Sequence, residues 1–145
     1  MNIMKTMKKY GGMAVLAAAA GALSANAGSH GETAQLPDLD YDLVAQVDVQ
    51  AVWRANCVGC HGANGKGQTR VGRRAGAKDL TDNAYQRSFT NAVAFKHTRE
   101  GMVVDGDEKM KPFGKDFTDD NGLTDEEIMA LVLYVREFDP QWSEE

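Results

Sequence analysis

Cysteine and long apolar runs are scarce in this sequence, and each absence narrows what the chain can be. Only two of its 145 residues are cysteines, so at most one disulfide can form. The longest apolar run after the first 30 residues spans eight residues, 128–135, and a membrane-spanning helix needs about 20. No stretch alternates convincingly as a half-buried strand does. We therefore expect one small, all-α domain.

The first 27 residues are typical of a secretory signal peptide. Lys5, Lys8 and Lys9 precede an Ala-rich apolar run over residues 11–23. Residues 24–27, Ser-Ala-Asn-Ala, then offer small side chains where a signal peptidase cleaves. The alternative is an uncleaved N-terminal anchor, but the apolar run is shorter than a membrane span. The sequence thus predicts export to the periplasm, with no membrane span in the mature chain.

The two cysteines are followed directly by a histidine, in the sequence Cys-Val-Gly-Cys-His at residues 57–61. In an exported protein such a pair can form a local disulfide. It could also be a thioredoxin-like redox pair, which requires a βαβ setting. A zinc site would need a second cysteine pair, and none exists. None of these alternatives explains the histidine.

Covalent haem attachment accounts for all three side chains. The spacing of Cys57 and Cys60 lets them reach the two vinyl groups of one porphyrin edge, and His61 then supplies the fifth iron ligand. We expect Gly62, Gly65 and the glycine at residue 67 to let the backbone turn tightly and approach the porphyrin. The sequence predicts one covalent haem c.

An electron carrier benefits from a fixed sixth ligand, because little then rearranges when the iron changes charge. Met110 is the predicted ligand, since it lies in a polar loop that Pro112 would stiffen. Met102 is the second choice, whereas we expect Met129 to pack in the last helix and His97 to face solvent. Thioether sulfur favours ferrous iron, so His/Met ligation implies a comparatively high potential.

Three helices are expected around the haem. Residues 47–56 have helical spacing, with Val49, Val52 and Trp53 on one face. Residues 90–99 form a second helix, capped by a threonine and ended by a glycine. The third begins with a capping box of Thr-Asp-Glu-Glu at residues 124–127. It continues in an apolar stripe, formed by Ile128, Leu131, Val132 and Val135.

Together these features resemble the small class I bacterial c-type cytochromes over residues 47–138. The resemblance rests on Trp53 before the first cysteine, on the glycine-rich stretch after the histidine, on Met110 with Pro-Phe, and on the final Leu-Thr-Asp-Glu-Glu-Ile. It implies a class I cytochrome c fold of three to five helices around one haem, with the first and last helices crossing. It also implies that His61 and Met110 ligate opposite haem faces. The family often has a proline after the motif, but residues 62–80 contain none, so no acceptor for the histidine N–H can be named.

The predicted organisation has four parts: a signal peptide over residues 1–27, a flexible extension over residues 28–46, a cytochrome c domain over residues 47–140, and a tail over residues 141–145. The predicted function is a periplasmic monohaem carrier of single electrons, and not an enzyme, because no acid–base or nucleophile arrangement suggests substrate turnover. Two alternatives stay open. The chain could be the haem subunit of a periplasmic dehydrogenase or oxidase complex, or a haem sensor or enzyme with an open sixth position.

Charge is segregated along the chain. Cleavage after residue 27 would leave a net charge of −8, which argues against nucleic acid as a partner. Residues 54–115 nevertheless carry a net charge of +6, between acidic residues 28–53 and 116–145. We expect their cations to rim the haem edge and to steer it toward redox proteins of a respiratory or dehydrogenase chain. These cations include Lys66, Arg70, Arg73, Arg74, Lys78, Lys109, Lys111 and Lys115.

Overall fold

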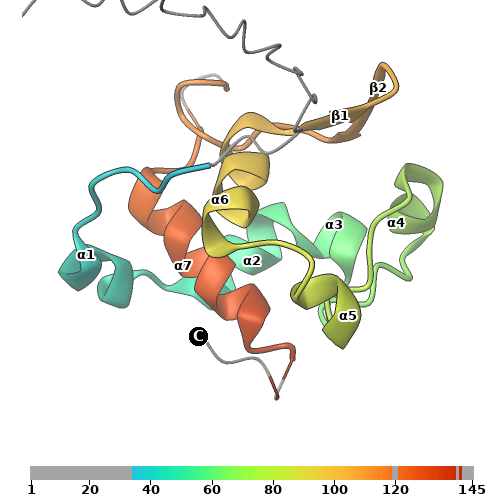
Figure 1. The fold of residues 1–145 in the computed structure, drawn as a ribbon, viewed down its shortest axis with the longest axis horizontal. Helices are drawn as coiled ribbons and strands as arrows, with labels where there is room; N and C mark the ends of the chain where they lie inside the picture. Colours follow the sequence, from blue (N-terminus) through green and yellow to red (C-terminus); the bar gives the residue numbers. More distant parts are fainter. Residues whose placement is uncertain (1–33, 119–120, 140, 142–145) are drawn as a thin grey trace, which may run out of the picture. The chain divides into compact units, whose positions relative to one another are not determined.

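The computed structural model describes residues 34–118, 121–139 and 141. The expected signal peptide, residues 28–33 of the extension, Pro140 and nearly all of the tail lie outside them. The described chain contains seven helices and one hairpin (Figure 1). In order they are α1 (Tyr41–Gln46), α2 (Val49–Asn56), α3 (Val58–His61), α4 (Arg70–Ala75), α5 (Asn83–Gln86), α6 (Asn91–Glu100), β1 (Met102–Val104), β2 (Asp107–Met110) and α7 (Asp125–Arg136). None of the helices seen here is long and apolar enough to cross a membrane.

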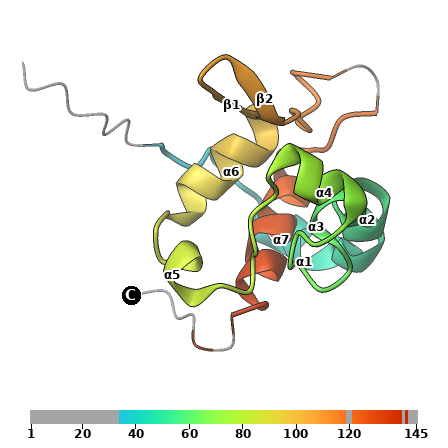
Figure 2. The same ribbon diagram turned by 90° about the vertical axis from the view of Figure 1, so that its right-hand side faces the viewer.

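Helix α7 is the element on which the core is built. Helices α1, α2 and α6 all pack against it (Figures 1 and 2). Its apolar stripe is buried as the helical spacing predicts, with Ile128, Leu131 and Val132 in the core. Met129 is buried there too, as expected. The all-α class is confirmed in its coarse form, because helices dominate the described chain.

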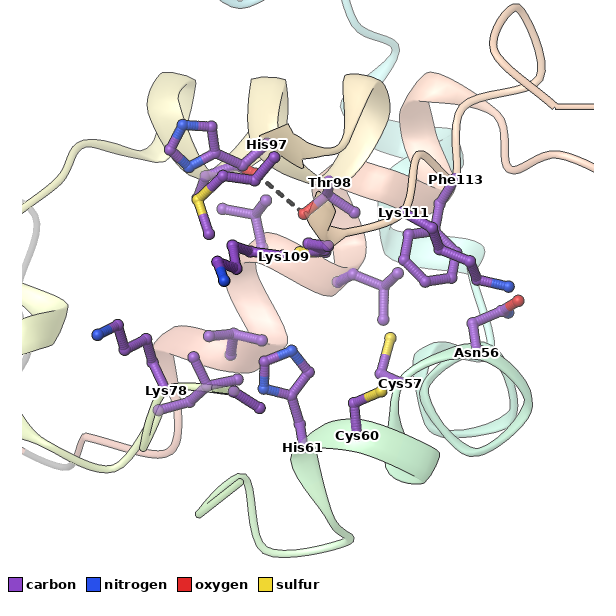
Figure 3. Close-up of a pocket in the computed structure, with 18 of the residues that line it drawn as sticks. Asn56, Cys57, Cys60, His61, Lys78, His97, Thr98, Lys109, Lys111 and Phe113 are labelled. Atoms are coloured by element: carbon purple, nitrogen blue, oxygen red, sulfur yellow. Dashed lines mark hydrogen bonds between the residues drawn. The ribbon is translucent and has the colours of Figure 1, made fainter. Parts of the chain in front are cut away.

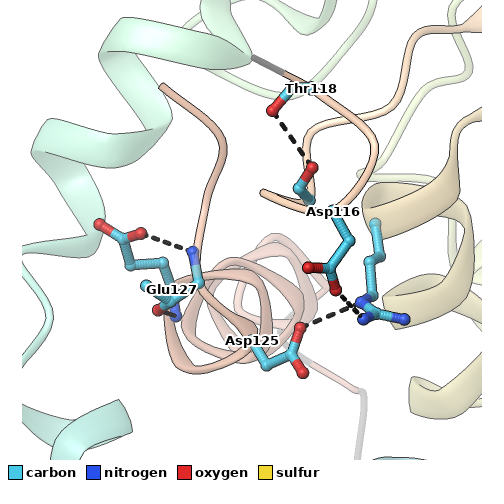
Figure 4. Close-up of polar contacts among 7 residues, drawn as sticks. Asp116, Thr118, Asp125 and Glu127 are labelled. Carbon is cyan, nitrogen blue, oxygen red and sulfur yellow. Dashed lines mark hydrogen bonds and ion pairs between the residues drawn. The ribbon is translucent and has the colours of Figure 1, made fainter. Parts of the chain in front are cut away.

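The predicted capping box at the start of α7 is present. The Thr124 hydroxyl accepts a hydrogen bond from the Glu127 backbone N–H at 3.2 Å, and the Glu127 carboxylate accepts one from the Thr124 N–H at 2.9 Å. Beside it, the Arg99 guanidinium bonds Asp125 at 3.1 Å and Asp116 at 2.5 Å (Figure 4). These contacts hold the end of α6 against the start of α7.

Helix α2 begins at an Asp48 cap, which accepts from the Ala51 N–H at 3.0 Å. It carries Trp53, only 3% exposed, onto α7. The indole lies 5.7 Å from the Tyr134 ring and 5.3 Å from the Phe138 ring, between centroids. The predicted helix over residues 47–56 is thus confirmed, and it contacts the last helix as the resemblance implied.

The structure differs from the prediction at the N-terminal side of the domain. Residues 41–46 were expected in a flexible extension, yet they form α1, which packs on α7. Asp40 caps it by accepting from the N–H groups of Asp42 and Leu43. Val44 is buried in the core. A good cap and one buried apolar residue are therefore enough to fix a six-residue helix.

The hairpin of β1 and β2 was not predicted. The short helices α1, α3, α4 and α5 were not predicted either, so the described chain has seven helices where three to five were expected. Its two-residue turn has Asp105 at φ 53° and Gly106 at φ 83°, and two positive φ values define the turn that suits a tight hairpin. Val103 is 67% exposed and Val104 is 44% exposed. Because apolar side chains on both faces of β1 are exposed to solvent, the strands lack the alternation of apolar and polar residues that would have identified them.

Helix α4 lies directly against α3. The Thr69 hydroxyl donates to the carbonyls of Gly59 at 2.8 Å and Cys60 at 3.0 Å. A Cβ added to Gly72 would lie 2.1 Å from the Cys60 carbonyl oxygen and 2.6 Å from that of Gly67. Only a glycine lets α4 approach the backbone of the Cys-Val-Gly-Cys-His segment this closely.

A Gly72→Ala substitution should therefore destabilise the protein by about 1–3 kcal/mol, the usual cost of overpacking. Gly59→Ala is the matched control, because Gly59 is also helical and has nothing within 4 Å of an added Cβ. Its stability should stay the same or rise by up to about 1 kcal/mol. Urea denaturation of the purified protein, followed by circular dichroism, measures both. Equal midpoints for the two variants would contradict the packing argument.

Candidate functional site

A cavity of about 350 Å³ lies between the α2–α3 segment on one side and α6, the hairpin and the residues after it on the other (Figure 3). Its lining is mostly apolar. The lining includes Trp53, Cys57, Cys60, His61, Lys78, Leu80, His97, Met102, Met110, Phe113, Leu131 and Arg136. All four residues predicted as haem-binding are in this set, although they come from two segments some 50 residues apart.

The junction of α2 and α3 presents the predicted attachment residues. The Cys57 N–H donates to the Trp53 carbonyl at 2.9 Å, and the His61 N–H donates to the Cys57 carbonyl at 2.9 Å. The chain therefore continues in helical turns from one helix into the next. In Figure 3 the side chains of Cys57, Cys60 and His61 all point into the cavity from this segment.

The environment of Cys57 argues against a redox-active thiol pair. Burial raises the pKa of the Cys57 thiol to about 12, with a further rise from Cys60 and a smaller opposing effect from Lys111. A thiol with such a pKa is protonated at neutral pH and is a poor nucleophile. The two cysteines form no disulfide with each other, and the described fold has no βαβ unit around them. Within the described residues no cluster of metal-ligating side chains could hold a zinc ion either.

His61 is suited to bind a metal through one ring nitrogen. Burial lowers its pKa, so the imidazole is neutral at pH 7. Its Nδ1 is buried without a hydrogen bond of ordinary geometry. The Lys78 backbone lies close enough to the ring to act on the pKa in the opposite direction. A metal-ligating histidine usually donates its other N–H to such a carbonyl, so Lys78 offers the acceptor that the sequence could not name.

The opposite wall carries three possible ligands. Met110 ends β2 instead of lying in an irregular loop, and Met102 pairs with it across the hairpin. His97 was expected to face solvent, but it is half-buried and lines the cavity from α6 (Figure 3). Burial lowers its pKa, and Lys96 adds to this while Glu100 opposes it. The prediction that His97 faces solvent was wrong. The α6 residues that line the cavity with it, Ala94 and Thr98, are small or polar, so the sequence does not mark this face of the helix as buried.

The glycines after the histidine allow tight turns and close packing within the protein, and they do not form the cavity wall. Gly62, Gly65 and Gly67 all have positive φ, so the predicted tight turns are confirmed. None of the three lines the cavity, however. A Cβ on Gly67 would lie 2.6 Å from the Ala77 carbonyl oxygen, and one on Gly65 would lie 2.9 Å from the Phe138 ring. The close approach that they permit is to other parts of the protein.

Arg136 is a residue of the site that sequence reasoning missed. It is 3% exposed and lines the cavity. Its guanidinium donates to both oxygens of Gln86, to Asn91 and to the Phe89 carbonyl, at 2.5–2.9 Å. It thereby fixes the α5–α6 connection at the cavity edge. Only the burial of a cation inside the last helix could have signalled this role, and the sequence does not show burial.

The cavity has the features of a site for a large apolar group. Its walls are mostly apolar, so an apolar group that covers them and removes them from water stabilises the fold. One buried nitrogen of its lining, Trp53 Nε1, makes no hydrogen bond with the described chain. A haem bonded through the cysteines fits these observations.

Comparison with known proteins decides the family. The family model for cytochrome c matches residues 46–139. The chain belongs to the cytochrome c family. As a small class I c-type cytochrome it carries covalently bound haem c, one group in a domain of this size, and it serves haem-based electron transfer.

Solved structures agree with the family. The cytochrome is similar to the KustC0563 c-type cytochrome, at 28% sequence identity and a TM-score of 0.52, over 64% of this chain and 99% of that one. A point mutant of that protein matches at 30% identity and a TM-score of 0.53, over 64% and 100% of the two chains. No curated protein matches the sequence.

Replacing both cysteines, Cys57→Ala with Cys60→Ala, should leave this cytochrome largely unfolded, because the cavity would lose the group that fills it. Circular dichroism of protein made in a host that matures c-type haem should show a loss of roughly half the helix signal or more, because apolar walls left in contact with water remove a large part of the stability of a small domain. The variant Gly59→Ala, which keeps both thiols, should retain the signal. Native helix content in the double variant would contradict the argument.

Proposed function

We propose that Cys57 and Cys60 form the thioether bonds to the haem and that His61 and Met110 are its axial ligands. We further propose that the cytochrome carries single electrons in the periplasm. The observation that carries the proposal is that these four side chains line one mostly apolar cavity. His61 stands on one wall and the methionine on the other, as two ligands on opposite faces require.

Each residue has a distinct part in this proposal. The two thioethers fix one haem edge to the α2–α3 junction, so the haem keeps its orientation through many cycles. The neutral His61 ring provides a nitrogen lone pair, and the softness of the Met110 sulfur favours the reduced state. The bound haem supplies the chemistry, a one-electron change between Fe(II) and Fe(III). The apolar lining limits water near the site, so little solvent needs to reorganise.

Export completes the proposal. The basic and apolar N-terminal sequence favours removal of residues 1–27 by signal peptidase. Exported proteins with a haem-attachment motif acquire their haem outside the cytoplasm, which suits a carrier in the periplasm. The two features agree with each other, because of the roles considered for the cysteine pair only haem attachment accounts for the histidine that follows it.

The purified protein should have the mass of residues 28–145 plus one haem. Its ferric form should show the far-red sulfur-to-iron charge-transfer band, and a redox titration should follow a single reversible one-electron curve. Reduced protein should bind carbon monoxide poorly at neutral pH, because the sixth position is filled. A bare polypeptide mass would contradict the attachment. Ready carbon monoxide binding without the far-red band would instead favour a sensor or enzyme with an open sixth position.

The partner is proposed to be a redox protein with an acidic docking face. Lys78, Lys109 and Lys111 line the cavity and lie around its mouth (Figure 3). Lys109 is paired with Asp107 at 3.2 Å, and the Lys111 ammonium lies 5.0 Å from the centroid of the Phe113 ring. Lys78 and Lys111 are thus the exposed cations best able to attract an acidic surface.

Electron exchange with an acidic redox protein should slow as salt rises, within the roughly 10- to 1,000-fold range of electrostatic steering. The double substitution Lys78→Gln with Lys111→Gln should lower the rate at low salt and flatten this dependence. Lys115→Gln is the matched control: the sequence placed Lys115 among the cations expected at the haem edge, but this exposed residue does not line the cavity. Stopped-flow kinetics measure all three proteins. A rate that is flat or rises with salt would count against docking through this face.

A further inference from the structure

The hairpin places a second methionine, Met102, beside Met110. Met102 and Met110 are paired residues of β1 and β2, and both are half-buried in the cavity lining. Residues directly opposite each other in an antiparallel pair point to the same face, with Cβ atoms about 4.5–5.5 Å apart. Two thioethers therefore reach the cavity from neighbouring points on one wall.

This pairing depends on an irregularity in the hairpin. The pairs Val104↔Asp107 and Val103↔Glu108 define a register that would next pair Met102 with Lys109. The register shifts between Met102 and Val103, so Met102 pairs with Met110 instead. A bulge of this kind inserts one residue into a strand and re-aims the side chains beyond it. Without it the two methionines would stand on opposite faces of the hairpin.

The base of the hairpin is held firmly. Gly101 has φ 80°, and a Cβ there would lie 2.8 Å from both the Met110 carbonyl oxygen and the Pro112 nitrogen. The Phe113 N–H donates to the Thr98 carbonyl at 3.1 Å, and the Gly114 N–H donates to that of Arg99 at 2.9 Å. Both strands are thus anchored on the end of α6, and they carry two flexible methionine side chains on this fixed base.

We propose that Met102 is a reserve axial ligand: when the Met110 sulfur leaves the iron, the Met102 sulfur takes its position. The exchange breaks one sulfur–iron bond and forms another, with no change in electron count. This rests on the proposed function, in which Met110 is the resident ligand. With Met102 in this role the sixth ligand remains a thioether sulfur, and the comparatively high potential that such a ligand gives is preserved.

Three leucine variants test this, because leucine conserves the methionine volume: Met110→Leu, Met102→Leu and the double variant. We expect Met110→Leu to keep the far-red sulfur-to-iron band, and the double variant to lose it. Carbon monoxide should bind the reduced double variant with roughly tenfold or greater affinity than reduced Met110→Leu, a factor equivalent to about 1.4 kcal/mol. Met102→Leu should keep the far-red band, because Met110 remains the resident ligand. The control Met129→Leu, buried away from the cavity lining, should behave as wild type, and circular dichroism checks that all four variants fold.

Loss of the far-red band in Met110→Leu, with carbon monoxide affinity equal to that of the double variant, would overturn the proposal. So would a low-spin spectrum of nitrogen ligation in that variant, because His97 or a lysine would then be the replacement. Loss of the band in Met102→Leu alone would make Met102 the resident ligand and also overturn its reserve role. Absence of the band from the wild-type protein would instead refute the proposed His/Met ligation, and the reserve role with it.

Discussion

The helices enclose a space that their own side chains do not fill, and most of the structure follows from that constraint. Helix α7 packs against α1, α2 and α6, and part of its surface, which includes Leu131 and Val132, borders the cavity. The chain is too short to build a larger apolar core. A covalently bound haem supplies the missing apolar surface, so the group that performs the function also completes the fold. This explains why the attachment segment is so closely supported by its neighbours.

Much of that support comes from residues that do not line the cavity. Thr69 and Gly72 bring α4 against the carbonyls of α3, and Gly67 lets the next loop pass close to residues 77–78. The Lys78 backbone then reaches the His61 ring. The opposite wall is fixed differently, by a bulged hairpin anchored on the end of α6. One wall is thus rigid through backbone packing, while the other carries flexible methionine side chains on a fixed base.

The elements that the sequence predicted well have their signals concentrated in a few adjacent residues. The capping box of α7 is one example, and the Cys-Val-Gly-Cys-His sequence at residues 57–61, from which one haem c was predicted, is another. Helix α1 was missed because its stability comes from burying Val44 against a helix some 80 residues away. The hairpin was missed although Asp105 and Gly106 are a strong turn signal, because its valines are exposed and hide the alternation. The bulge could not be predicted, since it depends on where the hairpin base is anchored.

The buried arginine shows how the fold and the site meet in one residue. Arg136 organises the α5–α6 connection through hydrogen bonds that include both oxygens of Gln86. It also lines the cavity, so the side chain that joins α7 to this connection forms part of the wall around the haem site. Because one side chain does both, removing its guanidinium would disturb the packing of α7 and the shape of the cavity together.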